Sequence, residues 1–231
     1  MNQRMRGSYA MVNRAMAILY CLTWKVLRCF RLPMAYSRVG MAELDRSTFP
    51  TDRHARLGAV YFRLGSRLGE PMSMNNLGAC YAKGVGVGRN VSQAVYWYRQ
   101  SALKMCPAAL HNLGYCLQEG EGVAVDKKKG YELTALAAAK GLPIAIYYQG
   151  LYKLRGMGCE KDEYIAFKCF HKAAWKGIAN AQYDLALCYL RGEGTGRSKL
   201  RALFWLCLSA LCGSPSARSA LTNSGCLNVS L

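Results

Sequence analysis

The sequence predicts an all-α fold, an α/α solenoid wound as a right-handed superhelix from four helix-loop-helix repeats of 36 residues, with partial capping repeats at its ends. Two observations carry this prediction. A Gly-x-Gly pair recurs every 36 residues, and further columns of small and apolar residues keep the same register without an insertion. Such self-similarity is typical of solenoids, whose units bury their apolar faces only against their neighbours. The glycine pairs are Gly84/Gly86, Gly120/Gly122, Gly156/Gly158 and Gly192/Gly194.

The register divides the chain into three parts. Residues 1–57 form a basic N-terminal targeting or membrane-interfacial segment and linker, residues 58–221 the solenoid, and residues 222–231 a C-terminal tail. Proline or a small residue starts each full repeat, and the stretch before the first repeat keeps the register of a second helix alone. We therefore expect a half repeat at 58–70, full repeats at 71–106, 107–142, 143–178 and 179–214, and a partial repeat at 215–221.

The first helix of each repeat is short and amphipathic. In the leading repeat it is expected over 72–83, with Ser73, Leu77 and Tyr81 as its apolar stripe at a spacing of four residues. Gly84 and Gly86 end this helix, because glycine readily adopts the positive φ of a tight helix exit. The same pattern predicts three further first helices in the later repeats.

The second helix of each repeat begins after a column of N-cap residues, whose side-chain oxygens accept from the first free amides of a helix. About 14 residues later a second glycine column, Gly141, Gly177 and Gly213, ends the helix, with Met105 in the same place in the leading repeat. Paired small residues in these helices let two helix axes approach closely. The N-cap column is Asn90, Asp126, Asp162 and Ser198.

These columns carry a family resemblance. The stretches Leu77–Ala102 and Leu185–Ala210 resemble the Sel-one-like repeat, a relative of the tetratricopeptide repeat. The resemblance covers 58–221, and the third repeat departs from it with Gln149 and Lys153 in place of Leu and Tyr. It implies a non-enzymatic scaffold or adaptor that holds a protein partner on a curved surface. It names no partner and transfers no catalytic residue.

The face of the first helices opposite the stripe is the predicted partner-binding groove. It lies on the concave side if the array curves as tetratricopeptide-like solenoids do. Its residues become more apolar toward the last two repeats, which suits an amphipathic helix or an extended peptide. Two alternatives stay open, that the chain's own termini cover these residues or that the helix phase is off by one. The predicted groove residues are Asn75, His111, Tyr115, Tyr147, Leu151, Leu154, Tyr183, Leu187 and Leu190.

The formal net charge of +18 suggests a second kind of partner. Cations open the second helices of the second and fourth repeats, where they oppose the helix dipole, so local stability does not explain them. A stripe of this kind could contact RNA or an acidic membrane surface, although no recurring pair of base-reading residues accompanies it. The alternatives are a subunit or assembly factor of an RNA–protein complex, a membrane-associated bacterial adaptor, or a plain solvated rim. The residues are Lys127, Lys128, Lys129, Arg197, Lys199 and Arg201.

The N-terminal segment is read separately from the repeats. Residues 1–42 hold seven Lys or Arg and no acid, and the apolar run Ala15–Trp24 is far shorter than the roughly 20 residues that span a bilayer. An Arg-rich, acid-free start resembles a mitochondrial transit peptide, which predicts a mitochondrial location. An interfacial helix or a bacterial signal segment, and an amphipathic helix packed on the first repeat, are the alternatives.

Residue types used in catalysis form no recognisable constellation. The eleven cysteines include no Cys-x-x-Cys, and their scatter over helices is typical of reduced thiols in a reducing compartment. His54, His111 and His171 belong to no nucleophile or zinc-binding motif. The Gly-x-Gly pairs follow helices and lack the ending of a phosphate-binding loop. We therefore expect no catalytic residue, no metal, no cofactor and no small-molecule substrate.

Overall fold

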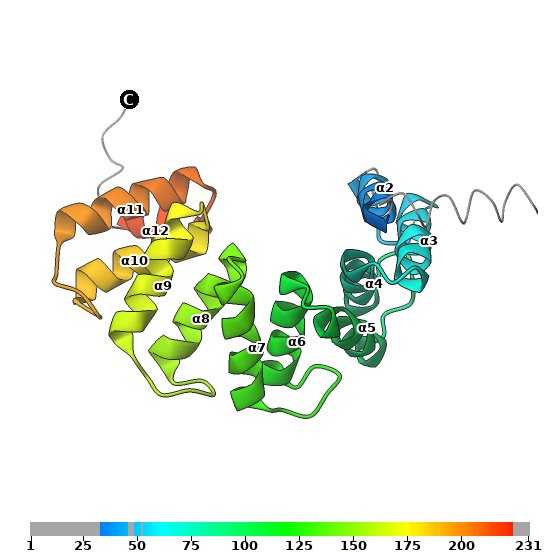
Figure 1. Cartoon of the computed structure of the whole chain (residues 1–231). Coiled ribbons are helices and arrows are strands. Elements are labelled where there is room, and N and C mark those ends of the chain that lie inside the picture. The colour runs from blue at the N-terminus through cyan, green and yellow to red at the C-terminus, as the bar shows by residue number, and fades with distance from the viewer. Residues whose placement is uncertain (1–32, 46–48, 52, 224–231) are drawn as a thin grey trace, which may run out of the picture. The chain divides into compact units, whose positions relative to one another are not determined.

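The computed structural model describes residues 33–45, 49–51 and 53–223. In these residues the chain forms eleven helices and no strand, which confirms the all-α repeat fold (Figure 1). The chain divides into two compact units, residues 1–89 with helices α2 to α4 and residues 90–231 with helices α5 to α12. The helices are α2 (Pro33–Asp45), α3 (Arg53–Arg67), α4 (Pro71–Lys83), α5 (Val91–Leu103), α6 (Pro107–Glu119), α7 (Lys127–Ala139), α8 (Pro143–Arg155), α9 (Glu163–Trp175), α10 (Ala179–Arg191), α11 (Lys199–Leu211) and α12 (Pro215–Asn223).

Each predicted repeat supplies two helices of 13 residues. The first helix of the leading repeat begins at Pro71, one residue before the predicted start, because proline suits the first turn, where an amide would have no partner. Ser73 and Leu77 are fully buried as the stripe requires, whereas Tyr81 is half-buried. In the second unit the pairs α6/α7, α8/α9 and α10/α11 pack in sequence order.

All four predicted N-cap residues cap a second helix. The amides of Gln93, Lys129, Ile165 and Arg201 donate to Asn90 Oδ1 at 3.0 Å, Asp126 Oδ1 at 3.0 Å, Asp162 Oδ1 at 2.9 Å and Ser198 Oγ at 3.4 Å. A cap of this kind contributes about 1 kcal/mol. The column therefore fixes where each second helix begins.

The two glycines of each loop have different roles. The first ends a helix in the left-handed conformation, with φ between 68° at Gly156 and 80° at Gly192. The second lies against the first turn of the preceding second helix, where a Cβ at Gly158 would overlap the carbonyl of Lys127 and one at Gly194 that of Glu163. The second glycine thus lets successive repeats of the second unit approach to backbone contact.

Small residues fill the helix crossings. Ala137 and Ala173 of the predicted small columns are completely buried, and Ser101 and Ser209 are buried as well. Met105 replaces the terminating glycine of the leading repeat and keeps its left-handed conformation at φ 58°. Among the described residues it is the only non-glycine residue with a positive φ, at a position where glycine stands in three repeats.

The N-terminal unit begins with two helices that pair. Helix α3 starts at Arg53, before the predicted half repeat 58–70, and α2 lies within the predicted segment and linker 1–57. The ring of Phe62 lies against Gly40, and Ser37 Oγ donates to the buried carboxylate of Glu70 at 2.5 Å. Residues 33–45 therefore form a packed helix.

The earlier part of that N-terminal segment, residues 1–32, lies outside the described residues together with its apolar run Ala15–Trp24. The targeting and membrane-interfacial expectations for it stay predictions. Within the described part of the chain, no helix has the length and the apolar character needed to cross a membrane.

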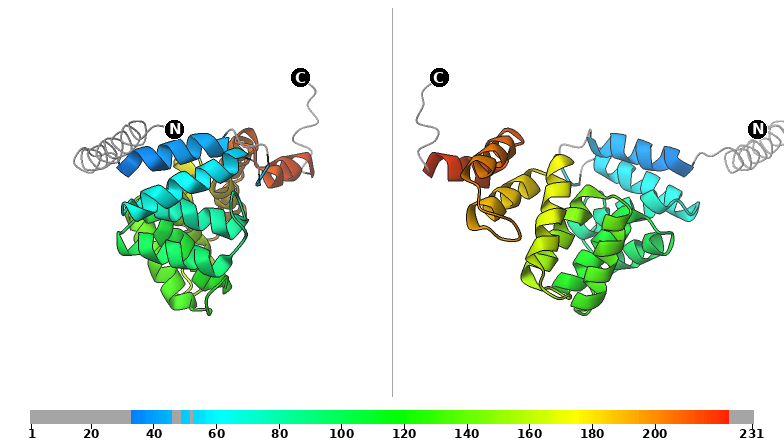
Figure 2. Two further views of the ribbon diagram at one scale, coloured as in Figure 1. Left: turned by 90° about the vertical axis from the view of Figure 1, so that its right-hand side faces the viewer. Right: turned by 60° about the vertical axis from the view of Figure 1, so that its left-hand side comes forward.

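The second unit ends with α12, which packs on α11 (Figure 2). Ala217 and Leu221 of this helix are buried. The predicted partial repeat 215–221 is thus a helix that continues to Asn223, because α12 buries its apolar side on the open end of the array. Residues 224–231 of the predicted tail lie outside the described residues.

Candidate protein-binding surfaces

The predicted groove residues lie on first helices. Asn75 belongs to α4 in the first unit, whereas the other eight belong to α6, α8 and α10 in the second unit. Three of the predicted groove residues, Asn75, His111 and Tyr147, are buried. Their side chains pack between helices and offer little surface to a partner. Leu190 is 43% exposed. The remaining five are half-buried, and with Leu190 they make the surface we call the first-helix face: Tyr115, Leu151, Leu154, Tyr183, Leu187 and Leu190.

Aromatic contacts join the first helices α6 and α8. The ring centroid of Tyr148 lies 4.9 Å from that of His111, 6.2 Å from that of Tyr115 and 5.5 Å from that of Tyr147. Tyr147 in turn donates its hydroxyl to Asp184 Oδ2 at 2.9 Å, which links α8 to α10. The predicted residues His111, Tyr115 and Tyr147 therefore meet around Tyr148.

Tyr148 and Asp184 were missed by the sequence prediction. They occupy one column of the repeat, which reads Asn76, Asn112, Tyr148 and Asp184. A column of polar residues inside an otherwise apolar helix pattern is a usable signal, because buried polar groups need partners. The prediction considered only the columns on either side of it.

Burial sets the protonation of this cluster. Desolvation lowers the pKa of His111 to about 4, because the charged imidazolium is disfavoured away from water. Burial also raises the pKa of Asp184, and the hydrogen bond from Tyr147 lowers it to a smaller extent. Desolvation together with the neighbouring Asp184 carboxyl raises the pKa of Tyr147. His111 is thus neutral at neutral pH, and the cluster serves packing and orientation.

The six predicted anion-contact cations are exposed, at the starts of α7 and α11. Arg197 Nε donates to the carbonyl of Arg191 at 3.0 Å, and the guanidinium of Arg201 lies 5.7 Å from the ring centre of Tyr189. Helix α9 stands between α7 and α11 in the array, and its first residue is Glu163, paired with Lys161 at 2.8 Å. The predicted cations therefore form two groups, and the equivalent positions at the intervening start of α9 hold the ion pair Lys161–Glu163.

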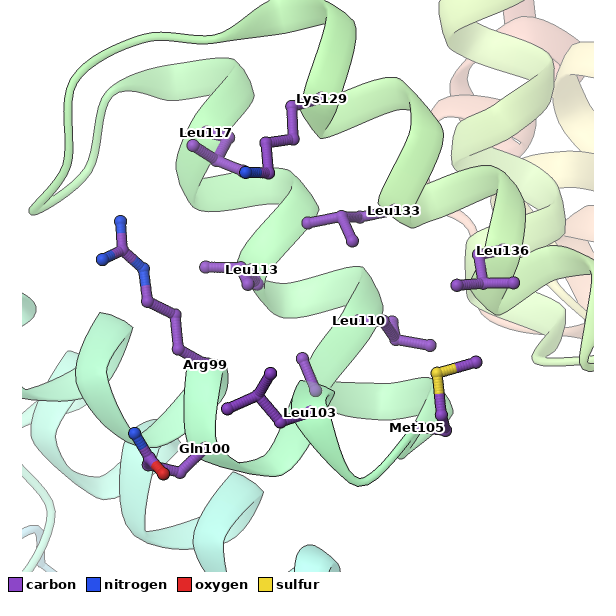
Figure 3. A pocket seen from close by; sticks show the side chains of 11 residues that line it. Arg99, Gln100, Leu103, Met105, Leu110, Leu113, Leu117, Lys129, Leu133 and Leu136 are labelled. Atoms are coloured by element: carbon purple, nitrogen blue, oxygen red, sulfur yellow. The ribbon is translucent and has the colours of Figure 1, made fainter.

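A groove that the sequence prediction did not contain lies between α5, α6 and α7 (Figure 3). Its volume is about 660 Å³. Leu103 stands on one wall, 78% exposed, and Arg99 and Lys129 lie at its edge. We call it the leucine groove. Its six leucines are Leu103, Leu110, Leu113, Leu117, Leu133 and Leu136.

The repeat register places equivalent gaps one and two repeats further on. In the gap between α7, α8 and α9, about 290 Å³ in volume, Gln149 and Cys169 replace two leucines, and the Cys169 thiol donates to Gln149 Oε1 at 3.7 Å. In the gap between α9, α10 and α11, Trp175 and Trp205 stand where the leucine groove has Leu103 and Leu133. Their rings meet edge to face at 5.4 Å, and this gap, which we call the tryptophan gap, keeps a smaller pocket of about 340 Å³ beside His171, Tyr189 and Arg201.

The described side chains offer little for metal or cofactor chemistry. No group of three or more His, Cys, Asp or Glu in the described part of the chain is placed to hold a metal ion. The eight described cysteines are free thiols, and burial raises the pKa of Cys80 and of Cys116 to about 11. These two thiols are therefore protonated, which makes them poor nucleophiles and poor metal ligands.

Comparisons with known proteins agree with this architecture. The Sel1 repeat model matches residues 71–104, 107–142, 143–177 and 179–214. A Sel1 repeat protein of Oxalobacter formigenes is 29% identical with a TM-score of 0.74, over 86% of this chain and 79% of that one. The protective antigen c5321 of uropathogenic Escherichia coli is 24% identical with a TM-score of 0.69, over 85% of this chain and 42% of that one.

The fold is also shared by immunity protein Pa5087 of Pseudomonas aeruginosa, which is 21% identical with a TM-score of 0.57, over 81% of this chain and 68% of that one. A search of curated proteins finds no match. Sel1 repeat proteins generally mediate protein–protein interactions and are typically non-catalytic. Because four matched repeats cover more than half of its length in the predicted register, this chain belongs to the Sel1 repeat family.

Proposed function

We propose that this chain is a non-enzymatic adaptor that binds a helix or an extended peptide of a protein partner on its first-helix face. The observation that carries the proposal is a row of partly exposed apolar side chains on the neighbouring helices α8 and α10. Leu151 and Leu154 lie on α8, and Tyr183, Leu187 and Leu190 continue the row one repeat later. Residues spaced by three and four lie on one side of each helix, and the Tyr147–Asp184 hydrogen bond links the two helices, so together they make an apolar strip that suits an amphipathic helix.

The surroundings of this strip support a specific peptide contact. The Tyr147 hydroxyl and Asp184 hold α8 and α10 together at its edge, so the strip is preorganised and a partner loses less freedom on binding. Arg155 and Arg191 end the two helices as exposed cations. A partner with apolar anchors followed by an acidic residue would match both features.

The test is capture of partners by the full-length chain with a cross-linker, followed by quantitative mass spectrometry. The double variant Tyr183→Asp/Leu187→Asp should lose the specific partner at least tenfold, because it places charges inside an apolar contact. Leu190→Asp, at an already exposed position, should cause a smaller loss without a risk to folding. Circular dichroism of each variant verifies its helix content.

The matched control is Leu136→Asp, which changes a leucine of the leucine groove on α7 that is 37% exposed. Under the proposal this variant retains the partner that Tyr183→Asp/Leu187→Asp loses. A partner lost by Leu136→Asp and kept by the double variant would assign binding to the leucine groove and contradict the proposal.

The subunit role in an RNA–protein complex is the second candidate, and it rests on the two groups of exposed cations at the starts of α7 and α11. The mitochondrial location stays a prediction that rests on residues 1–32. A truncated chain that starts at Pro33 tests it, since this start removes the basic segment and leaves α2 whole. Unchanged location of that truncated chain in cells would contradict a transit function.

A further inference from the structure

The outward side of α11 carries an apolar stripe that nothing in the described structure covers. Leu200, Phe204 and Leu211 are 83%, 56% and 83% exposed. With the exposed Cys207 they follow a spacing of four, three and four residues, which places all four on one side of the helix. The opposite side of α11 is buried through Ala202 and Trp205, so the helix is apolar on both sides. A helix of this kind normally has a partner on each side.

In the other second helices of this unit, the same four positions hold a mixture of polar, charged and apolar residues. They read Ser92, Tyr96, Arg99 and Leu103 in α5, Lys128, Glu132, Ala135 and Ala139 in α7, and Tyr164, Lys168, His171 and Trp175 in α9. Each of these three stripes carries at least one charged side chain, which is typical of a solvated surface. The stripe of α11 carries none, so the repeat pattern itself does not explain it.

Cations border the stripe, and acids are absent from this end of the chain. Arg197, Lys199 and Arg201 lie at the start of α11, and no Asp or Glu follows Glu193 in the sequence. The ion pairs among the described residues involve none of these three cations. The combination of exposed leucine and phenylalanine with uncompensated cations on one helix matches a surface that is apolar and negatively charged.

We propose that the outward side of α11 lies in the interface of an anionic membrane, with Leu200, Phe204 and Leu211 in the acyl boundary and Lys199 and Arg201 at the headgroups. The helix has 13 residues, and no described helix is long and apolar enough to span a bilayer, so α11 lies in the plane of the membrane.

The cations beside the α11 stripe favour a membrane over a second copy of the chain as its partner. Two α11 stripes packed against each other would bring two sets of cations into one contact with no acid to offset them. An anionic lipid surface instead attracts each cation, by about fivefold in binding per Lys or Arg. This role is independent of the first-helix face, which belongs to α6, α8 and α10.

The experiment is co-sedimentation of the full-length chain with two kinds of vesicle, phosphatidylcholine alone and phosphatidylcholine with roughly one part in three of phosphatidylglycerol. We expect binding to the anionic vesicles only. The variant Leu200→Ser/Phe204→Ser should bind at least tenfold more weakly, because it removes the apolar insertion. Lys199→Gln/Arg201→Gln should lose about fivefold per charge, and raising the salt concentration should reduce this loss.

The matched control is Tyr96→Ser, at the position of α5 that corresponds to Phe204 and with a similar exposure of 50%. It should leave vesicle binding unchanged. Three outcomes would overturn the proposal. The first is equal binding to both kinds of vesicle or to neither. The second is anionic binding that survives Leu200→Ser/Phe204→Ser, which would assign it to residues 1–32. The third is concentration-dependent dimerisation, measured by light scattering, that this variant abolishes while vesicle binding remains.

Discussion

The leucine groove and the tryptophan gap occupy the same place in two repeats and differ only in their side chains. Leu103 and Leu133 leave an open space of about 660 Å³, whereas Trp175 and Trp205 meet at 5.4 Å and the equivalent gap keeps a pocket of about 340 Å³. The backbone register and the side-chain N-caps are the same on both sides, and the turn that follows the first of the two second helices is left-handed in both, at Met105 and at Gly177. In this solenoid the repeat fixes where a surface lies, and a few bulky residues decide how open it is.

The largest expected effect concerns the turn glycines on which both regions depend. Gly122→Ala and Gly194→Ala place a Cβ against the backbone of Val91 and Glu163 and force a positive φ on alanine. We expect each to lower the free energy of unfolding by about 3 kcal/mol, since overpacking and backbone strain add. Urea denaturation measures this loss.

The control for the glycine turns is Gly196→Ala in the same loop as Gly194. An added Cβ at Gly196 meets nothing within 4 Å, and no positive φ is required there. It should therefore change stability by less than about 0.5 kcal/mol. Equal losses in all three variants would mean that the second glycine does not set the approach of the repeats.

The next largest effect on stability is expected from Trp205→Leu, a substitution that makes the tryptophan gap more like the leucine groove. Trp205 is 5% exposed and contacts Trp175, His171 and Phe204, so Trp205→Leu removes packed ring surface and leaves a cavity. We expect a loss of about 2 kcal/mol in the free energy of unfolding. Leu133→Ala should cost less, about 1 kcal/mol, because Leu133 is half-exposed. A larger loss at Leu133 would contradict the assignment of the open groove.

The repeats around the two regions could be predicted in detail because their signals are local. The N-cap oxygen of Asp126 and the left-handed turn at Gly156 act within a few residues of the chain, so one column of the sequence suffices to find each. The buried small residues follow from the same register. These features are also the ones that the structure confirms.

The surfaces were harder to predict because they depend on side chains that meet across repeats. The leucine groove needs Leu103, Leu113 and Leu133 from three helices and two repeats, and no single column contains them. A packed helix in the N-terminal segment could be given only as one alternative, and the bounds of α2 not at all, because it lies upstream of the recurring pattern, where no second copy supports it. Its anchor, the hydrogen bond from Ser37 to the buried Glu70, connects residues 33 positions apart.

Acid should lower the free energy of unfolding through His111 on α6, which is one of the helices of the leucine groove. The helices of the tryptophan gap should be affected less. His111 of α6 is buried with its pKa lowered to about 4 from 6.5, and its ring lies against Tyr148. The unfolded chain therefore binds a proton that the folded chain does not, so stability is complete above pH 6.5 and falls as the pH drops toward 4. We expect a loss of about 1 to 2 kcal/mol between pH 6.5 and pH 5.

The variant His111→Asn tests this origin of the acid sensitivity. Asparagine occupies the equivalent buried position in the leading repeat, Asn75, so the site tolerates that side chain type in this fold. Urea unfolding at several pH values should show a smaller acid slope for the variant than for the wild type. An unchanged slope would place the sensitivity elsewhere in the chain.

Closing the leucine groove should change stability little. Leu103→Trp/Leu133→Trp copies the tryptophan pair, and because Leu103 is 78% exposed we expect the free energy of unfolding to shift by less than about 1 kcal/mol. The change should instead appear in ligand binding.

An anionic apolar dye suits the leucine groove, with Arg99 and Lys129 at its edge, and the fluorescence of the bound dye should fall in Leu103→Trp/Leu133→Trp. The reciprocal variant Trp175→Leu/Trp205→Leu should raise the fluorescence, since it enlarges the pocket of about 340 Å³ in the tryptophan gap. The stripe on α11 contributes equally in both variants, so a change of the same sign in both would show that the two tryptophans do not limit the size of this pocket.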